Sequence, residues 1–203
     1  MPWTRRTMRA AVAALAVLLA ISSALAYPKP AAVAPRWELE FAPGDLRLYV
    51  DPDSGGNYWH FTYMVTNRTG RDQVWAPTFA LFTDVGEILP SGRGVPARVA
   101  ADIKILLGNG FLEHQNEIIG EIFHGRDHAK EGLVVWPARQ LEVNEVSMFI
   151  AGTSGETATV VNPMTGESVL LRKTLQRDYL IPGEAAARGA KPIELVSQHW
   201  VMR

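Results

Sequence analysis

Glu121, His124 and His128 are the residues of this chain whose types and spacing come nearest to a metal site. On a continuous helix they would share one face, and two imidazoles with one carboxylate are typical zinc ligands. However, Gly125 separates the histidines and is typical of a helix end, beyond which His128 would leave that face. The H-E-x-x-H order of zinc hydrolases is also absent. We keep the three as candidate metal ligands, favour the alternative of solvated loop histidines, and predict no cofactor.

Two further motifs lack a required residue. Asp51 and Asp53 match the first and third positions of a calcium loop, but Thr62 stands where that loop needs a bidentate glutamate. The tripeptide beginning at Asp53 also matches one half of an aspartic protease dyad, and no second copy supplies the partner. These patterns favour a turn, and we predict that the protein is not an enzyme.

Arg172, Arg177 and Tyr179 are the candidate binding residues, since they cluster near one predicted strand. Two residues apart, Arg177 and Tyr179 fall on the same face of that strand. Such a pair suits an acidic partner or a polysaccharide carboxylate. The alternative is an ordinary solvated surface, where charged residues are common.

The tryptophans allow a carbohydrate-binding interpretation, because planar aromatic rings stack on sugars. Most of them stand among apolar neighbours, as Trp59 does, and large aromatic residues contribute mainly to core packing. We therefore favour a core role for them.

Alternation of apolar and polar residues predicts the elements that position these side chains. The clearest strand is 57–67, with Trp59, Phe61, Tyr63 and Val65 on one face. Similar short patterns predict further strands at 37–41, 45–50, 74–83, 133–136, 145–151, 158–161, 168–171, 174–181 and 192–203. Seven to nine such strands are typical of an antiparallel, immunoglobulin-like β-sandwich.

Between residues 96 and 125 the apolar residues no longer alternate with polar ones and instead recur at helical spacing. Val99, Ile103 and Leu106 predict one helix that stops at Gly108. A second helix is predicted to start with Asn116 as its cap and to end at Gly125. The predicted fold is therefore mainly β with a short two-helix insertion.

Residues 1–26 have the layout of a signal peptide. Arg5, Arg6 and Arg9 precede an apolar stretch, and the small-residue site 24–26 predicts cleavage after Ala26. The alternative is an uncleaved N-terminal anchor. Residues 27–35 then form a Pro-rich tether, and 36–203 form a single β-sandwich domain. We expect a secreted or periplasmic protein.

The composition of the chain limits the kinds of partner and site that we expect. Of the 20 basic residues three lie in the signal, whereas all 21 acidic residues follow it, so the mature chain is mildly acidic. Scattered charge of this kind does not suit nucleic acid. No second long apolar run is present, and we expect no membrane span in the mature chain. With no cysteine, thiolate metal sites and thiol catalysis are excluded.

Two short segments, 171–176 and 200–203, resemble the C-terminal end of an uncharacterised family of bacterial exported proteins. The strand and turn at 65–70 are similar to a feature of bacterial immunoglobulin-like modules. Neither resemblance implies an activity. We expect a non-enzymatic interaction or structural module of the envelope or extracellular space, whose partner is another protein there. The alternatives are a ligand-binding module for carbohydrate or a metal ion, and then an envelope hydrolase.

Overall fold

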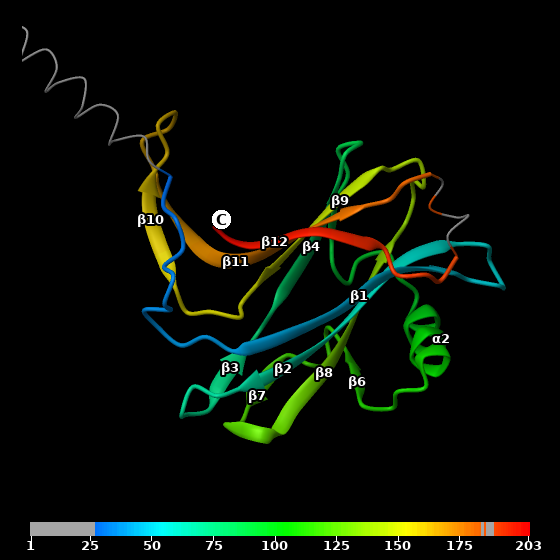
Figure 1. The fold of residues 1–203 in the computed structure, drawn as a ribbon, viewed down its shortest axis with the longest axis horizontal. Helices are drawn as coiled ribbons and strands as arrows, with labels where there is room; N and C mark the ends of the chain where they lie inside the picture. The colour runs from blue at the N-terminus through cyan, green and yellow to red at the C-terminus, as the bar shows by residue number, and fades with distance from the viewer. Residues whose placement is uncertain (1–26, 184, 186–188) are drawn as a thin grey trace, which may run out of the picture.

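The computed structural model describes residues 27–183, 185 and 189–203. The predicted signal peptide, residues 1–26, lies outside the described residues. The described chain is mainly β, with antiparallel sheets and, within those residues, one α-helix (Figure 1). No helix there has the length and apolar character needed to cross a membrane.

The first sheet has four strands, in the spatial order β1, β2, β8 and β6. Their bounds are β1 Glu40–Val50, β2 Asn57–Asn67, β6 Leu112–His114 and β8 Gly125–Pro137. β1, β2 and β8 are antiparallel, whereas the short β6 joins β8 in parallel. The predicted turn between β1 and β2 is present, and it is closed by a backbone hydrogen bond from Asp51 to Gly56.

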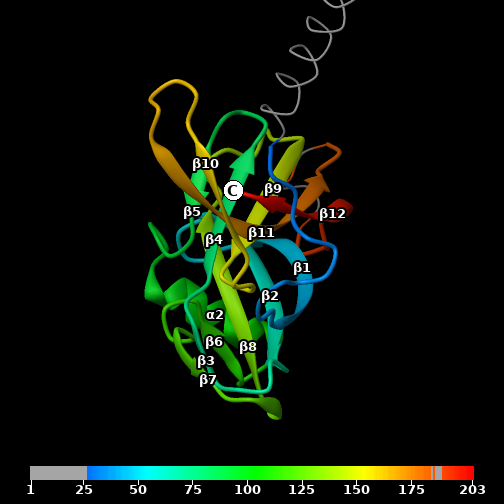
Figure 2. The same ribbon diagram turned by 90° about the vertical axis from the view of Figure 1, so that its left-hand side faces the viewer.

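The second sheet has six strands and is antiparallel throughout. Its strands are β4 Thr78–Thr83, β5 Ile88–Pro90, β9 Glu145–Ala151, β10 Thr157–Val161, β11 Ser168–Leu180 and β12 Glu194–Met202. The long β11 replaces the two strands predicted at 168–171 and 174–181, and it pairs with β9, β10 and β12. The hairpin of β10 and β11 extends beyond the rest of the sheet (Figures 1 and 2).

The strand predicted at 74–83 was expected to have a bulge or an edge position at Pro77, but the strand breaks there completely. It divides into β3 (Gln73–Trp75), which pairs with β7 (Gly120–Ile122), and β4, which belongs to the six-stranded sheet. Pro77 lies at the break. Proline lacks the N–H that a continuous ladder needs, which explains why the chain changes sheets there.

The two sheets pack face to face around a shared core. The predicted inner face of β2 is confirmed, since Trp59, Phe61, Tyr63 and Val65 are all buried. The rings of Tyr63 and of Phe79 on β4 stack across the interface, with centroids 5.0 Å apart. Trp75 and Trp136 are also fully buried, as the core interpretation of the tryptophans predicts.

Helix α2 (Ala97–Leu107) covers the outer face of the four-stranded sheet, on the side away from β11 and β12 (Figure 1). The predicted helix is confirmed, and Gly108 ends it in the left-handed conformation, at φ 62°. Val99 and Ile103 pack on Leu133 and Val135 of β8 and form a second core.

The second predicted helix, from Asn116 to Gly125, is absent. A turn follows β6, then comes β7, and β8 already begins at Gly125. Ile118 and Ile122 are buried as expected, but in the core between the sheets. Over so short an apolar segment, periodicity alone does not separate a helix from a turn and strand.

The predicted tether lies against the six-stranded sheet. The Tyr27 hydroxyl donates to the Met202 carbonyl at 2.6 Å, and the Ala31 N–H donates to Glu156 at 2.8 Å. Trp37 packs so closely on Gly155 that a side-chain Cβ there would lie 2.5 Å from its indole nitrogen. Residues 27–35 contain no strand or helix, but these contacts hold the segment along the sheet.

Candidate functional site

The structure separates the candidate metal ligands. Glu121 lies on β7 and His128 on β8, while the His124 ring accepts a hydrogen bond from the Gly70 N–H at 3.1 Å. His128 packs its ring against Phe123. In the described part of the chain, no group of three or more acidic or histidine side chains is arranged to hold a metal ion.

Asp51 and Asp53 belong to an ion-pair cluster centred on Arg98 of α2. Arg98 donates to Asp51 at 2.6 Å, to Asp102 at 2.9 Å and to Asp53 at 3.1 Å. A hydrogen bond from the Arg98 side chain, with another from Ser54, holds the pKa of Asp51 well below its ordinary value. The cluster therefore ties the β1–β2 turn to the helix.

The candidate binding residues fall on opposite faces of β11. Arg177 and Tyr179 share a face as predicted, but that face is the inner one and both side chains are buried. The Arg177 guanidinium donates to the Tyr179 hydroxyl at 2.7 Å and to the Gln198 side chain at 2.5 Å. Arg172 is exposed on the other face. The three residues do not form one surface.

A different polar cluster occupies the outer face of the six-stranded sheet. Asp178 of β11 accepts hydrogen bonds from Ser147 at 2.7 Å, Ser197 at 2.6 Å and Gln176 at 2.8 Å. Burial alone would raise the pKa of Asp178, but these hydrogen bonds outweigh it and lower the pKa. The His199 ring nitrogen lies 4.0 Å from the same carboxylate.

This cluster combines serine, histidine and aspartate, the residue types of a hydrolase. Both hydroxyls donate to Asp178, however, whereas nucleophilic catalysis needs a serine paired with a histidine base. The arrangement instead links β9, β11 and β12 across the sheet.

β12 is an edge strand: among the described residues, only β11 pairs with it. Arg172 and Arg203 exchange both backbone hydrogen bonds, at 2.7 and 3.0 Å. In an antiparallel ladder such bonded pairs recur at every second residue. Gln198, Trp200 and Met202 therefore direct their backbone groups away from β11. The hydrogen bond from Tyr27 to the Met202 carbonyl agrees with this register.

The other long edge strand, β1, is protected. Its ladder with β2 is interrupted between Pro43 and Leu46, and the Ile193 N–H donates to the Leu46 carbonyl at 2.8 Å. β5 is only three residues long and ends in Pro90. Short strands, proline and irregular register are the ordinary means of preventing edge pairing. β12 has nine residues and contains no proline; within the described chain its edge is interrupted by the bulge near Ser197 and is occupied at the Met202 carbonyl by the Tyr27 hydroxyl.

Sequence reasoning predicted the strand at 192–203 but not that it is an edge. There was little indication of an edge in the sequence, because Leu195 and Val196 are apolar and were predicted to dock into a core. Their side chains are 42% and 63% exposed instead. Leu195 and Val196 are consecutive, so on a strand they point to opposite faces and cannot both enter one core. This departure from alternation was the available indication that part of the strand is uncovered.

No family model matches this sequence, and comparisons with curated proteins and with solved structures found no match either.

Proposed function

We propose that this protein is an exported, non-enzymatic interaction module with an immunoglobulin-like β-sandwich. In this proposal it binds an extended segment of another envelope or extracellular protein along β12. The single observation that carries the proposal is the open backbone edge of β12 within the described residues. The N-terminal sequence pattern supports export.

The chemistry of the edge suits strand addition. In this mode, backbone hydrogen bonds supply affinity, and alternate side chains supply specificity. The outward N–H and C=O of Gln198 and Trp200 offer the hydrogen bonds, and exposed Leu195 and Val196 offer apolar contacts. Ser197 of β12 donates to Asp178 of β11, and this hydrogen bond helps to hold β12 in register with the sheet.

Replacing Gln198 by proline tests the proposal, since it removes one outward N–H without removing a bond to β11. Gln198→Ala is the matched control, because it also deletes the side chain that accepts from Arg177 but keeps the N–H. A photo-crosslinking residue at position 196 of the mature protein, in its native envelope, reports binding. We expect one discrete protein adduct in the control and its loss in Gln198→Pro.

Thermal melts establish that both variants fold. The proposal is overturned if folded Gln198→Pro forms the adduct as well as Gln198→Ala does. It is also overturned if the otherwise unchanged protein gives no adduct.

A further inference from the structure

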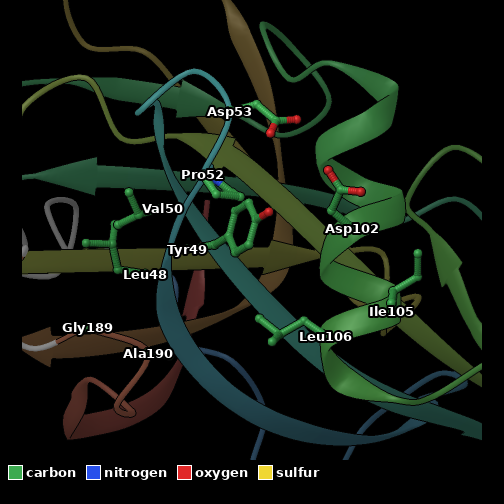
Figure 3. A pocket seen from close by; sticks show the side chains of 10 residues that line it. All are labelled: Leu48, Tyr49, Val50, Pro52, Asp53, Asp102, Ile105, Leu106, Gly189 and Ala190. Carbon is green, nitrogen blue, oxygen red and sulfur yellow. The ribbon is translucent and has the colours of Figure 1, made fainter.

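A second surface feature lies between the β1–β2 turn and α2. It is an open groove of about 660 Å3 (Figure 3). Its lining comprises Leu48, Tyr49, Val50, Pro52, Asp53, Asp102, Ile105, Leu106, Gly189 and Ala190. The Tyr49 ring lies in the middle, with α2 as one wall. A volume of this order accommodates several side chains.

The groove exposes large aliphatic side chains that the fold leaves uncovered. Ile105 is 78% exposed and Leu106 is 60% exposed, and Val50 of β1, which is 47% exposed, also lines the groove. Ile103, by contrast, is completely buried on the sheet side of the same helix. Clustered apolar exposure of this kind marks a binding surface more often than a single exposed residue does.

One rim of the groove carries excess negative charge. Among the described residues, Arg98 is the only cation paired with Asp51, Asp53 and Asp102, and Asp51 is buried against it. The carboxylates of Asp53 and Asp102 remain partly open to solvent, at 74% and 34% exposure. The pKa of Tyr49 is raised, mainly by burial and also by the negative charges of Asp102 and Asp51. The second cause agrees with a negative local field.

The neighbouring basic group is already engaged. Arg47 forms an ion pair with Asp45 at 2.6 Å and donates to the Ala190 carbonyl at 2.9 Å. Among the described residues, Arg98 faces three carboxylates, so the rim formed by Asp53 and Asp102 keeps a net negative charge that a cationic group of a ligand can balance.

We propose that this groove binds a segment of a partner protein in which a large apolar residue lies next to a lysine or arginine. The apolar side chain packs on Tyr49, Ile105 and Leu106. The cation reaches the open carboxylates of Asp53 and Asp102. Apolar contact supplies the affinity, and charge complementarity supplies selectivity and a faster association rate. The site uses residues distinct from those of β12 and extends beyond the proposed function.

A displayed library of random twelve-residue peptides, selected on the mature protein, tests this site. We expect the selected peptides to carry Lys or Arg within two positions of Leu, Phe or Trp. Ile105→Glu should weaken their binding by about tenfold or more, and Asp53→Lys by about tenfold. Ile119→Glu is the matched control, since Ile119 is 52% exposed but does not line the groove.

A charge swap sharpens the result. A selected peptide with its basic residue changed to glutamate should bind Asp53→Lys better than it binds the unchanged protein. Selection of peptides without a basic residue, no selection at all, or equal weakening in Ile119→Glu would each overturn the proposal. Gln198→Pro should bind the same peptides, which separates this test from that of the β12 edge.

Discussion

The outer faces of the two sheets differ in what covers them. On the four-stranded sheet, Leu133 and Val135 face outward and α2 buries them. On the six-stranded sheet the outward residues include a polar group around Ser147 and Asp178 together with Phe82 and Phe149, and no helix in the described chain covers them. Both faces arise from the same alternation along strands.

The difference shows that a second face can be stabilised in two ways. The covered face gains free energy by burying apolar surface, and it needs a helix whose opposite side then meets solvent. The open face needs side-chain hydrogen bonds to hold its strands, and Arg203 lies over the rings of Phe82 and Phe149. The groove lies beside the helix that covers the four-stranded sheet, whereas the β12 edge belongs to the six-stranded sheet with the open face.

The largest expected effect comes from removing the contact that covers the four-stranded sheet. Ile103→Ala leaves a cavity in the second core and should lower the free energy of unfolding by about 2–5 kcal/mol. Ile105→Ala, on the exposed side of α2, should change it by less than about 0.5 kcal/mol. Urea melts measure both. Equal losses would mean that α2 does not cover the sheet as described.

Acid should lower the stability of the protein, because the covered face of the four-stranded sheet buries His60. Burial lowers the pKa of His60 to about 4, and the positive charge of Arg47 contributes. Between about pH 6.5 and pH 4 the unfolded chain binds the proton and the folded chain does not, so stability falls as pH falls. The loss approaches about 3 kcal/mol at full protonation.

His60→Leu should make the stability curve flatter over that range, as measured by urea melts at successive pH values. Burial also lowers the pKa of His114, so the difference between the two proteins isolates His60. Thr62→Ala, on the same face of β2, is the control and should keep the full acid dependence. Parallel curves for His60→Leu and the unchanged protein would contradict a buried, neutral His60.

The open face should give a smaller effect. Asp178→Ala removes the acceptor for Ser147, Ser197 and Gln176, and these partly exposed donors regain water. We expect a loss of about 1 kcal/mol in urea melts. Asp127→Ala removes an exposed carboxylate of β8 and should cost less than about 0.5 kcal/mol. If the two losses match, hydrogen bonds to Asp178 do not stabilise the open face.

Strong local patterns predicted most strands. The 57–67 strand carries long alternation, and 145–151 has the predicted bounds, because alternation and pleat share a period of two. The helix at 97–107 was predicted since Pro96 and Gly108 bound its helical spacing. The prediction of a helix at 116–125 was wrong because the few apolar residues there fit the period of a helix and that of a strand equally well. Arg177 was misplaced because alternation gives a shared face without saying which face is inner.

The sequence by itself determined where strands form, which side of β2 enters the core, and where α2 ends. These depend on neighbours along the chain, through alternation, capping and turn residues. Only the tertiary structure decided that β12 is an edge, that Ile105 and Leu106 stay exposed, and that Arg177 points inward. Each of these depends on which distant segment lies alongside, as Arg177 does on Gln198 and the α2 cluster on Asp51. Local patterns carry no record of such pairings, because sheet order and packing are set by contacts between segments far apart in the chain.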